Sequence, residues 1–190
     1  MKSKFDHLTA DQVGNLFPIQ MVPYNPDWIF IYEQEKALIR GVLGDDIALN
    51  IEHFGSTSVA GLAAKPTIDL LVEVSKLTDE LKQIITQKLG TIGYGNMENA
   101  EKENQMTFGK GYDENDKCLQ TYHVHIHEKG NSPQDEIIFR DYLRQNADVR
   151  DRYAKLKYTL AEKYQFHREN YTKGKTDFIV QITEKAKITF

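Results

Sequence analysis

The chain has 190 residues, with 24 Lys or Arg against 28 Asp or Glu and a formal net charge of -4 at pH 7. This length is enough to bury roughly 70% of the surface that the unfolded chain exposes, which supports an ordinary hydrophobic core. Acidic and basic residues are interspersed rather than gathered in a basic face, which argues against sequence-independent binding of duplex nucleic acid. The single cysteine, Cys118, excludes an intramolecular disulfide and a CxxC motif.

The N-terminal residues are polar and interrupted by charge, so they resemble neither a signal peptide nor a membrane-spanning helix. We therefore expect a cytoplasmic protein with no membrane partner. Residues 1–21 carry no sustained hydrophobic period, and we expect them to form a loosely attached N-terminal arm.

Regular structure is expected to begin near Pro23. Asn25-Pro26-Asp27 offers a cap, a proline and a first-turn acid ahead of apolar residues at helical spacing, which end at Gly44. Residues 47–51 alternate as in a half-buried strand, and a Gly-Ser turn with a short helix follows. Residues 68–74 are apolar on both faces apart from two acids, which is typical of a covered strand.

Strands and helices continue after residue 77. Thr78 caps an expected helix to about residue 89, and residues 94–97 and 106–108 are weaker strand candidates. Residues 119–127 alternate between an apolar face and a face of Thr and His side chains. After the Ser132-Pro133 cap, the apolar residues recur every three to four positions, which predicts only helices in the rest of the chain.

These patterns predict an α/β (α+β) fold in which a mixed β-sheet is flanked by helices and followed by a helical C-terminal portion. We expect one domain over residues 22–190, rich in strands over 22–128 and helical over 132–188.

Asp69 is the first candidate site residue. A carboxylate inside an apolar strand is costly unless it is paired, hydrogen-bonded or bound to a cation. The alternative is a buried Asp that accepts hydrogen bonds from the backbone or a lysine. Glu73 points to the same face, but roughly 13 Å of strand separates it from Asp69, too far for the two to share one metal ion directly.

The turn Gly55-Ser56-Thr57-Ser58 is the second candidate. Glycine allows close backbone approach, and hydroxyls with free amides at a helix start suit a phosphate. Ordinary helix capping explains the same residues. Basic residues beside turns could converge on an anion or be solvated surface charges; they are Lys65, Lys110, Arg168, Lys173 and Lys175.

His123 and His125 are the third candidate. Side chains two apart on a strand stand roughly 7 Å from each other, close enough for two imidazoles to bind one metal ion or one phosphate. We expect His127 to face solvent, whereas His53 could face the same cleft or pack beneath it. A serine hydrolase triad is disfavoured because no G-x-S-x-G elbow is present.

The chain resembles the GrpB family in four stretches. They are VPYNPDW at residues 22–28, IEHFGSTSVAGLAAKPTIDLLV at 51–72, HVH at 123–125 and FRDYLR at 139–144. The resemblance runs from about residue 22 to 186 and includes Arg168, Tyr171 and Lys175. Since that family is placed in the nucleotidyltransferase superfamily, the resemblance implies a nucleotidyltransferase-like fold.

The superfamily signature is an apolar residue, Gly and Ser in a turn, then a strand with two acids separated by one residue. Phe54-Gly55-Ser56 and Asp69 match it, but Leu71 stands at the second acid position. His123 or His125 replaces a third acid that a later strand usually supplies. This departure weakens a two-metal mechanism.

The resemblance therefore implies an enzyme that holds a small phosphorylated ligand, a nucleotide, at Gly55, Ser56, Thr57, Ser58 and Lys65. A divalent metal, Mg²⁺ or Mn²⁺ with Zn²⁺ as the alternative, would bind Asp69, His123 and His125, and Arg168 and Lys175 would neutralise phosphate charge. Two other hypotheses remain open: a non-catalytic nucleotide-binding or phosphometabolite-binding regulatory module, and a metal-dependent phosphate-ester hydrolase.

Overall fold

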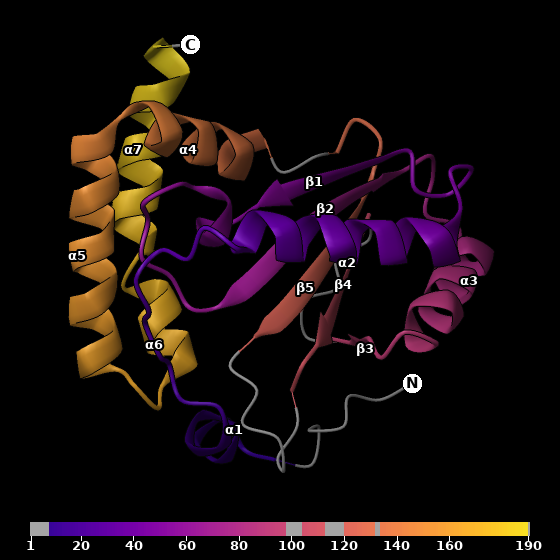
Figure 1. The fold of residues 1–190 in the computed structure, drawn as a ribbon, viewed down its shortest axis with the longest axis horizontal. Helices are drawn as coiled ribbons and strands as arrows, with labels where there is room; N and C mark the ends of the chain where they lie inside the picture. The colour runs from indigo at the N-terminus through magenta and orange to yellow at the C-terminus, as the bar shows by residue number, and fades with distance from the viewer. Residues whose placement is uncertain (1–7, 98–103, 113–119, 132–133, 190) are drawn as a thin grey trace. The chain divides into compact units, whose positions relative to one another are not determined.

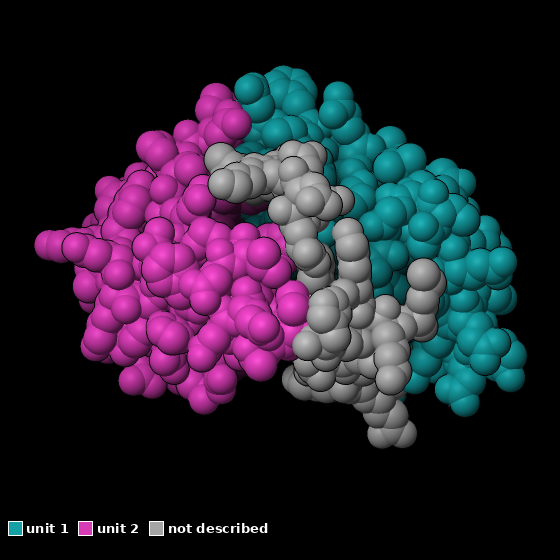
Figure 2. Space-filling view, turned by 90° about the horizontal axis from the view of Figure 1, so that it is seen from below, with its two compact units in different colours: residues 1–6, 27–54, 67–132 teal, residues 7–26, 55–66, 133–190 magenta. Residues whose placement is uncertain are grey.

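The computed structural model describes residues 8–97, 104–112, 120–131 and 134–189. The chain divides into two compact units, each assembled from separate stretches of sequence (Figure 2). The sheet unit comprises residues 1–6, 27–54 and 67–132, and the helical unit comprises residues 7–26, 55–66 and 133–190. Cys118 and the Ser132-Pro133 cap lie outside the described residues.

The sheet unit contains a five-stranded mixed sheet in the order β1-β2-β5-β4-β3 (Figure 1). Strand β2 pairs with β5 in parallel, and the other neighbours are antiparallel. This confirms the predicted mixed sheet with helices. Its elements are α2 (Trp28–Leu43), β1 (Asn50–Phe54), β2 (Thr67–Val74), α3 (Asp79–Gly90), β3 (Gly95–Asn96), β4 (Gln105–Lys110) and β5 (Thr121–Glu128).

The two faces of this sheet differ in chemistry. On one face, Ile68, Leu70 and Val72 of β2 are fully buried. Helix α2 packs on that face, where the Tyr32 ring stacks on His53 at 4.5 Å between ring centroids. His53 therefore packs within the covered face. Because side chains alternate along a strand, the odd-numbered residues of β2 and β5 lie on the other face.

In its described residues, the helical unit contains the short helix η1 (Ser56–Ser58) and five α-helices. These are α1 (Ala10–Leu16), α4 (Gln134–Gln145), α5 (Ala147–Lys163), α6 (Arg168–Lys173) and α7 (Thr176–Thr189). The segment after η1 joins the helical core because Val59 and Leu62 are buried in one cluster with residues of α4, α5 and α7, namely Phe139, Tyr142, Leu143, Val149, Tyr153, Ile182 and Ala186.

Residues 8–21, the described part of the expected N-terminal arm, contain the helix α1 and make specific contacts. Thr9 and Gln12 form a reciprocal capping box at the start of α1. A Cβ added at Gly14 would lie 1.8 Å from the Phe166 carbonyl oxygen, so this turn of α1 approaches the backbone closely. Ile19 is buried, and its amide donates to the Gln165 carbonyl at 2.8 Å. A seven-residue helix is too short to show a hydrophobic period, which is why the sequence pattern missed it.

Most predicted elements are present with shifted ends. Helix α2 begins at Trp28 rather than at Pro26, and β1 begins at Asn50 rather than near residue 47. The prediction of a single domain from residue 22 stays a prediction. Among the described residues, no helix is long and apolar enough to cross a membrane.

Candidate functional site

The parallel pairing of β2 with β5 brings the Asp and His candidates together. Asp69 lies opposite His123 in the register, and Leu71 lies opposite His125. Paired residues point to the same side of a sheet, so all four side chains share the face that α2 does not cover. Two segments more than fifty residues apart thus supply one polar cluster.

The geometry of Asp69, His123 and His125 suits a single metal ion. Nδ1 of His123 lies 3.3 Å and Nε2 of His125 3.9 Å from Oδ1 of Asp69. One ligand atom from each residue lies within 4.8 Å of the other two. Tetrahedral zinc with bonds of roughly 2.1 Å separates its ligand atoms by about 3.4 Å. The three side chains are 20–27% exposed, so an ion in solution can reach them.

The electrostatics of Asp69 favour a bound cation. Burial alone would raise the pKa of the Asp69 carboxyl, but hydrogen bonds and charge from His123 and His125 outweigh it and hold that pKa well below its ordinary value. The carboxylate is therefore ionised at neutral pH, as a metal ligand must be.

Tyr112 extends the cluster beyond the three predicted residues. Its hydroxyl lies 2.6 Å from Nε2 of His123, and the two rings stack at 5.9 Å. Gly109, opposite His123 on β4, leaves room for this ring, since a Cβ there would lie 3.3 Å from Cε2 of Tyr112. In the tautomer that leaves Nδ1 of His123 free to bind a metal ion, Nε2–H donates to the Tyr112 hydroxyl oxygen, which fixes the imidazole orientation.

Neighbouring residues define the limits of the cluster. Phe54 packs edge-on against His125 at 5.0 Å between centroids. Leu71, at the expected second acid position, is only 5% exposed and provides no ligand. His127, expected to face solvent, is instead buried, and its Nδ1 lies 3.2 Å from the Asn131 carbonyl oxygen. Among the described residues, the only group found that could hold a metal ion is Asp69, His123 and His125.

The Gly55–Ser58 turn belongs to the helical unit, and several of its polar groups contact each other. Gly55 has φ 73° and ψ -177°, a conformation that essentially only glycine adopts. The Ser58 hydroxyl donates to the Gly55 carbonyl at 2.7 Å, and Thr57 is buried. The Ser56 side chain hydrogen-bonds with Tyr153. The Ser58 hydroxyl thus closes the η1 turn by bonding to the Gly55 carbonyl.

The predicted basic residues divide into two groups. Lys65 and Lys175 of the helical unit both contact the Tyr171 ring, with their ammonium groups at 5.5 and 4.6 Å from its centroid. By contrast, Nε and Nη2 of Arg168 donate to the Phe17 carbonyl at 3.1 and 3.0 Å. The other two pair with acids in the structure, Lys110 with Glu35 and Lys173 with Glu169.

Lys157 was missed by the sequence interpretation. It lies on α5 and is 2% exposed, and its Nζ donates to the Ala63 carbonyl at 2.6 Å. It stands four residues after Tyr153 and three before Leu160, both buried, so it falls on the inward stripe of the helix. That position in the helical pattern was the signal that could have identified it.

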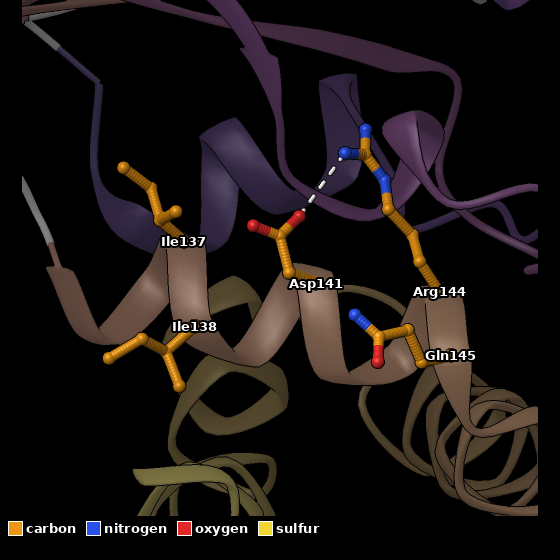
Figure 3. Close-up of a pocket in the computed structure, with 5 residues that line it drawn as sticks. All are labelled: Ile137, Ile138, Asp141, Arg144 and Gln145. Carbon is orange, nitrogen blue, oxygen red and sulfur yellow. Dashed lines mark hydrogen bonds and ion pairs between the residues drawn. The ribbon is translucent and has the colours of Figure 1, made fainter. Parts of the chain in front are cut away.

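A surface pocket on α4 does not coincide with any of these groups. It is lined by side chains of a single helix (Figure 3), namely Ile137, Ile138, Asp141, Arg144 and Gln145. Arg144 Nη1 donates to Asp141 Oδ1 at 3.2 Å, and Arg140 also pairs with Asp141. Burial would raise the pKa of Asp141, but the hydrogen bonds and charges of the two arginines lower it. Because Asp141 and the two arginines pair with each other, we interpret these side chains as stabilising the structure rather than binding a ligand.

Comparison with known proteins identifies one family. The family described as GrpB protein matches residues 18–185. The UPF0157 protein BH1888 of Halalkalibacterium halodurans is 35% identical over 189 residues, which cover 97% of this chain and 92% of that protein. The UPF0157 protein YqkA of Bacillus subtilis is 33% identical over 92% of this chain, but the match covers only 50% of YqkA.

Solved structures give a consistent result. The conserved protein GrpB from Enterococcus faecalis is 31% identical, with a TM-score of 0.76 over 88% of this chain and 96% of that one. The Cid1 poly(U) polymerase also matches, at 12% identity and a TM-score of 0.49 over 82% of this chain and 46% of that one. That second likeness is too distant to bear on fold or function.

Proposed function

The chain belongs to the GrpB family, and from this premise we propose that it is a nucleotidyltransferase-like enzyme that binds a nucleotide and a divalent metal ion. The observation that carries the proposal is the cluster of Asp69, His123 and His125, whose ligand atoms all lie within 4.8 Å of one another. A cytoplasmic location and the absence of a membrane partner stay predictions.

The donor set indicates which ions fit. Two imidazole nitrogens and one carboxylate oxygen suit Zn²⁺ or Mn²⁺ better than Mg²⁺, which prefers oxygen ligands. Three protein ligands leave positions open for a substrate oxygen, as in catalytic zinc sites. When bound, the ion would act as a Lewis acid on a phosphoryl oxygen. Because Leu71 provides no ligand, we propose one ion rather than two.

The helical unit would supply the phosphate contacts. We assign them to Gly55, Ser56, Lys65 and Lys175. Ser58 and Arg168 would support the site through their hydrogen bonds to the Gly55 and Phe17 carbonyls, and the buried Thr57 would support it by packing. In nucleotidyl transfer, an acceptor oxygen attacks the α-phosphorus, the bond to the pyrophosphate oxygen breaks, and the acceptor proton is released. Such reactions depend on positioning and charge stabilisation more than on covalent catalysis by the protein.

The test measures how nucleotides and metal ions stabilise the folded protein. Thermal unfolding would be followed with ATP, GTP, CTP or UTP, each with EDTA, Mg²⁺, Mn²⁺ or Zn²⁺, for the wild type and Asp69→Asn. A ligand at 100 times its Kd adds roughly 2.7 kcal/mol to the free energy of unfolding. We expect a metal-dependent shift with a triphosphate that Asp69→Asn abolishes. Absence of any nucleotide shift in the wild type would refute the proposal.

A regulatory module is the main alternative, and the buried Leu71 favours it because a ligand of the superfamily signature is missing. The module would bind nucleotide without releasing pyrophosphate, and its binding would tolerate EDTA. A metal-dependent phosphate-ester hydrolase is the other alternative, since one carboxylate and two imidazoles with open positions also suit hydrolytic zinc. It would release inorganic phosphate from a generic ester such as p-nitrophenyl phosphate.

A further inference from the structure

Lys157 occupies an unusual position for a lysine. Its side chain is 2% exposed, although lysines are almost never fully buried unless they are paired. The Ala63 carbonyl accepts a hydrogen bond from Nζ, and the Tyr153 ring lies 4.8 Å from Nζ. Both contacts are with neutral groups. Among the residues that the structure describes, no carboxylate lies within ion-pairing distance of Lys157.

Two further lysines of the helical unit, Lys65 and Lys175, share a contact with one tyrosine ring. Ala63, which accepts the Lys157 hydrogen bond, lies two residues before Lys65. The ammonium groups of Lys65 and Lys175 lie 5.5 and 4.6 Å from the centroid of the Tyr171 ring, which is itself buried. Lys65, Lys157 and Lys175, called here the three-lysine cluster, thus come from the segment after η1, from α5 and from the residue just before α7.

The three positive charges act on one another. Burial is the main cause that lowers the pKa of Lys157 well below its ordinary value, and repulsion from Lys175 and then from Lys65 lowers it further. Like charges gathered around a buried amine destabilise the folded state in the absence of an anion. An anion of two or more charges would reverse this repulsion.

We propose that the three-lysine cluster is an anion site for the phosphate groups of a phosphorylated ligand, with Lys157 as its buried member. The proposal deepens the proposed function, because it names the residues that bind the phosphates. Ammonium groups suit this ligand since each offers a point charge with three donors. Arg168 is left out because its guanidinium donates to the Phe17 carbonyl.

The experiment uses inorganic pyrophosphate as the probe and EDTA to remove metal. Isothermal titration and thermal unfolding would be measured for the full chain, Lys157→Met, Lys175→Met and the matched control Lys163→Met. Lys163 is on the same helix and also stands over a tyrosine ring, Tyr164 at 5.0 Å, but it is exposed.

We expect pyrophosphate to stabilise the wild type and the Lys163→Met control. The Kd should rise roughly tenfold or more in Lys157→Met and in Lys175→Met, as expected for loss of a charge-assisted hydrogen bond. Without ligand, Lys157→Met should melt about 2–4 °C above the wild type because a buried charge is removed.

Two results would overturn the inference. One is equal pyrophosphate affinity in the wild type, Lys157→Met and Lys175→Met; the other is no pyrophosphate binding by the wild type. If Lys157→Met does not fold, Lys175→Met decides, since its side chain is only half-buried. Asp69→Asn should keep metal-free pyrophosphate binding, so failure of the proposed metal-dependent reaction is distinguished from failure of this site.

Discussion

Tyr112 contacts the imidazole of His123 on the nitrogen opposite the one that faces Asp69. Partners of this kind hold a metal-binding histidine in its tautomer and orientation, and losing one typically weakens metal binding about 10- to 100-fold. We therefore expect Tyr112→Phe to raise the Kd for Mn²⁺ or Zn²⁺ by roughly tenfold. Isothermal titration of the chelator-treated protein measures this directly.

The control for this prediction is Tyr158→Phe, which removes a hydroxyl from a residue that is 43% exposed on α5. Its metal affinity should equal that of the wild type. If Tyr112→Phe also bound metal with wild-type affinity, the phenol would have no positioning role toward His123.

Lys157 makes the stability of the wild type depend on pH in a particular direction. Its folded-state pKa is lowered by burial and by Lys175 and Lys65, so between that pKa and its unfolded value near 10.4 the unfolded state binds more protons. Stability contributed by this group therefore rises with pH over that window. In urea unfolding, the free energy of unfolding of the wild type should therefore rise relative to that of Lys157→Met as the pH is raised. A pH-independent difference would show that Lys157 does not titrate on unfolding.

The candidate metal residues could be predicted from sequence because each breaks a strand pattern. Asp69 interrupts an apolar run, and His123 and His125 alternate with buried residues. Tyr112 could not be found in this way, because its contact with His123 depends on the register of β4 with β5. Lys157 was overlooked since a lysine on a helix is usually exposed.

The turn after β1 depends on a single backbone conformation. Gly55 has φ 73° and ψ -177°, which costs a residue with a Cβ of the order of 1–3 kcal/mol. We expect Gly55→Ala to lower the free energy of unfolding by that amount in urea denaturation.

Gly41→Ala is the control for Gly55→Ala, and we expect its effect on the free energy of unfolding to have the opposite sign. Gly41 lies inside α2 with an ordinary helical backbone, and a Cβ there meets nothing within 4 Å. Gly41→Ala should therefore stabilise the protein by roughly 0.5–1 kcal/mol. Equal effects of the two substitutions would contradict the assignment of strain to Gly55.

At the level of elements, periodicity predicted the long strands and helices well. Helix α3 follows its Thr78 cap, whose side chain accepts from the Leu81 amide, and β2 covers the expected residues. The parallel pairing of β2 with β5 could not be derived, because periodicity defines the face of a strand but not its neighbour. The pairing is what places Asp69 beside His123.

The two compact units are interleaved along the chain, which affects how the protein can be divided. Residues 55–66 fall between strands β1 and β2 yet belong to the helical unit. A fragment of residues 1–132 would therefore keep Val59 and Leu62 while losing the side chains of α4, α5 and α7 that bury them.

We expect that fragment to aggregate or to lack a cooperative unfolding transition, because it exposes apolar surface that the full chain buries. Circular dichroism during heating and size-exclusion chromatography provide the measurement. A soluble fragment with the melting temperature of the full chain would show that residues 1–132 fold without helices α4 to α7.

The measurement that tests the account most directly is metal titration of the chelator-treated protein, with the wild type compared to Asp69→Asn and His125→Ala. The proposed centre predicts one Mn²⁺ or Zn²⁺ per chain in the wild type, tighter binding than for Mg²⁺, and strongly weakened binding in both variants. Unchanged binding in Asp69→Asn, or no binding by the wild type, would contradict the metal centre.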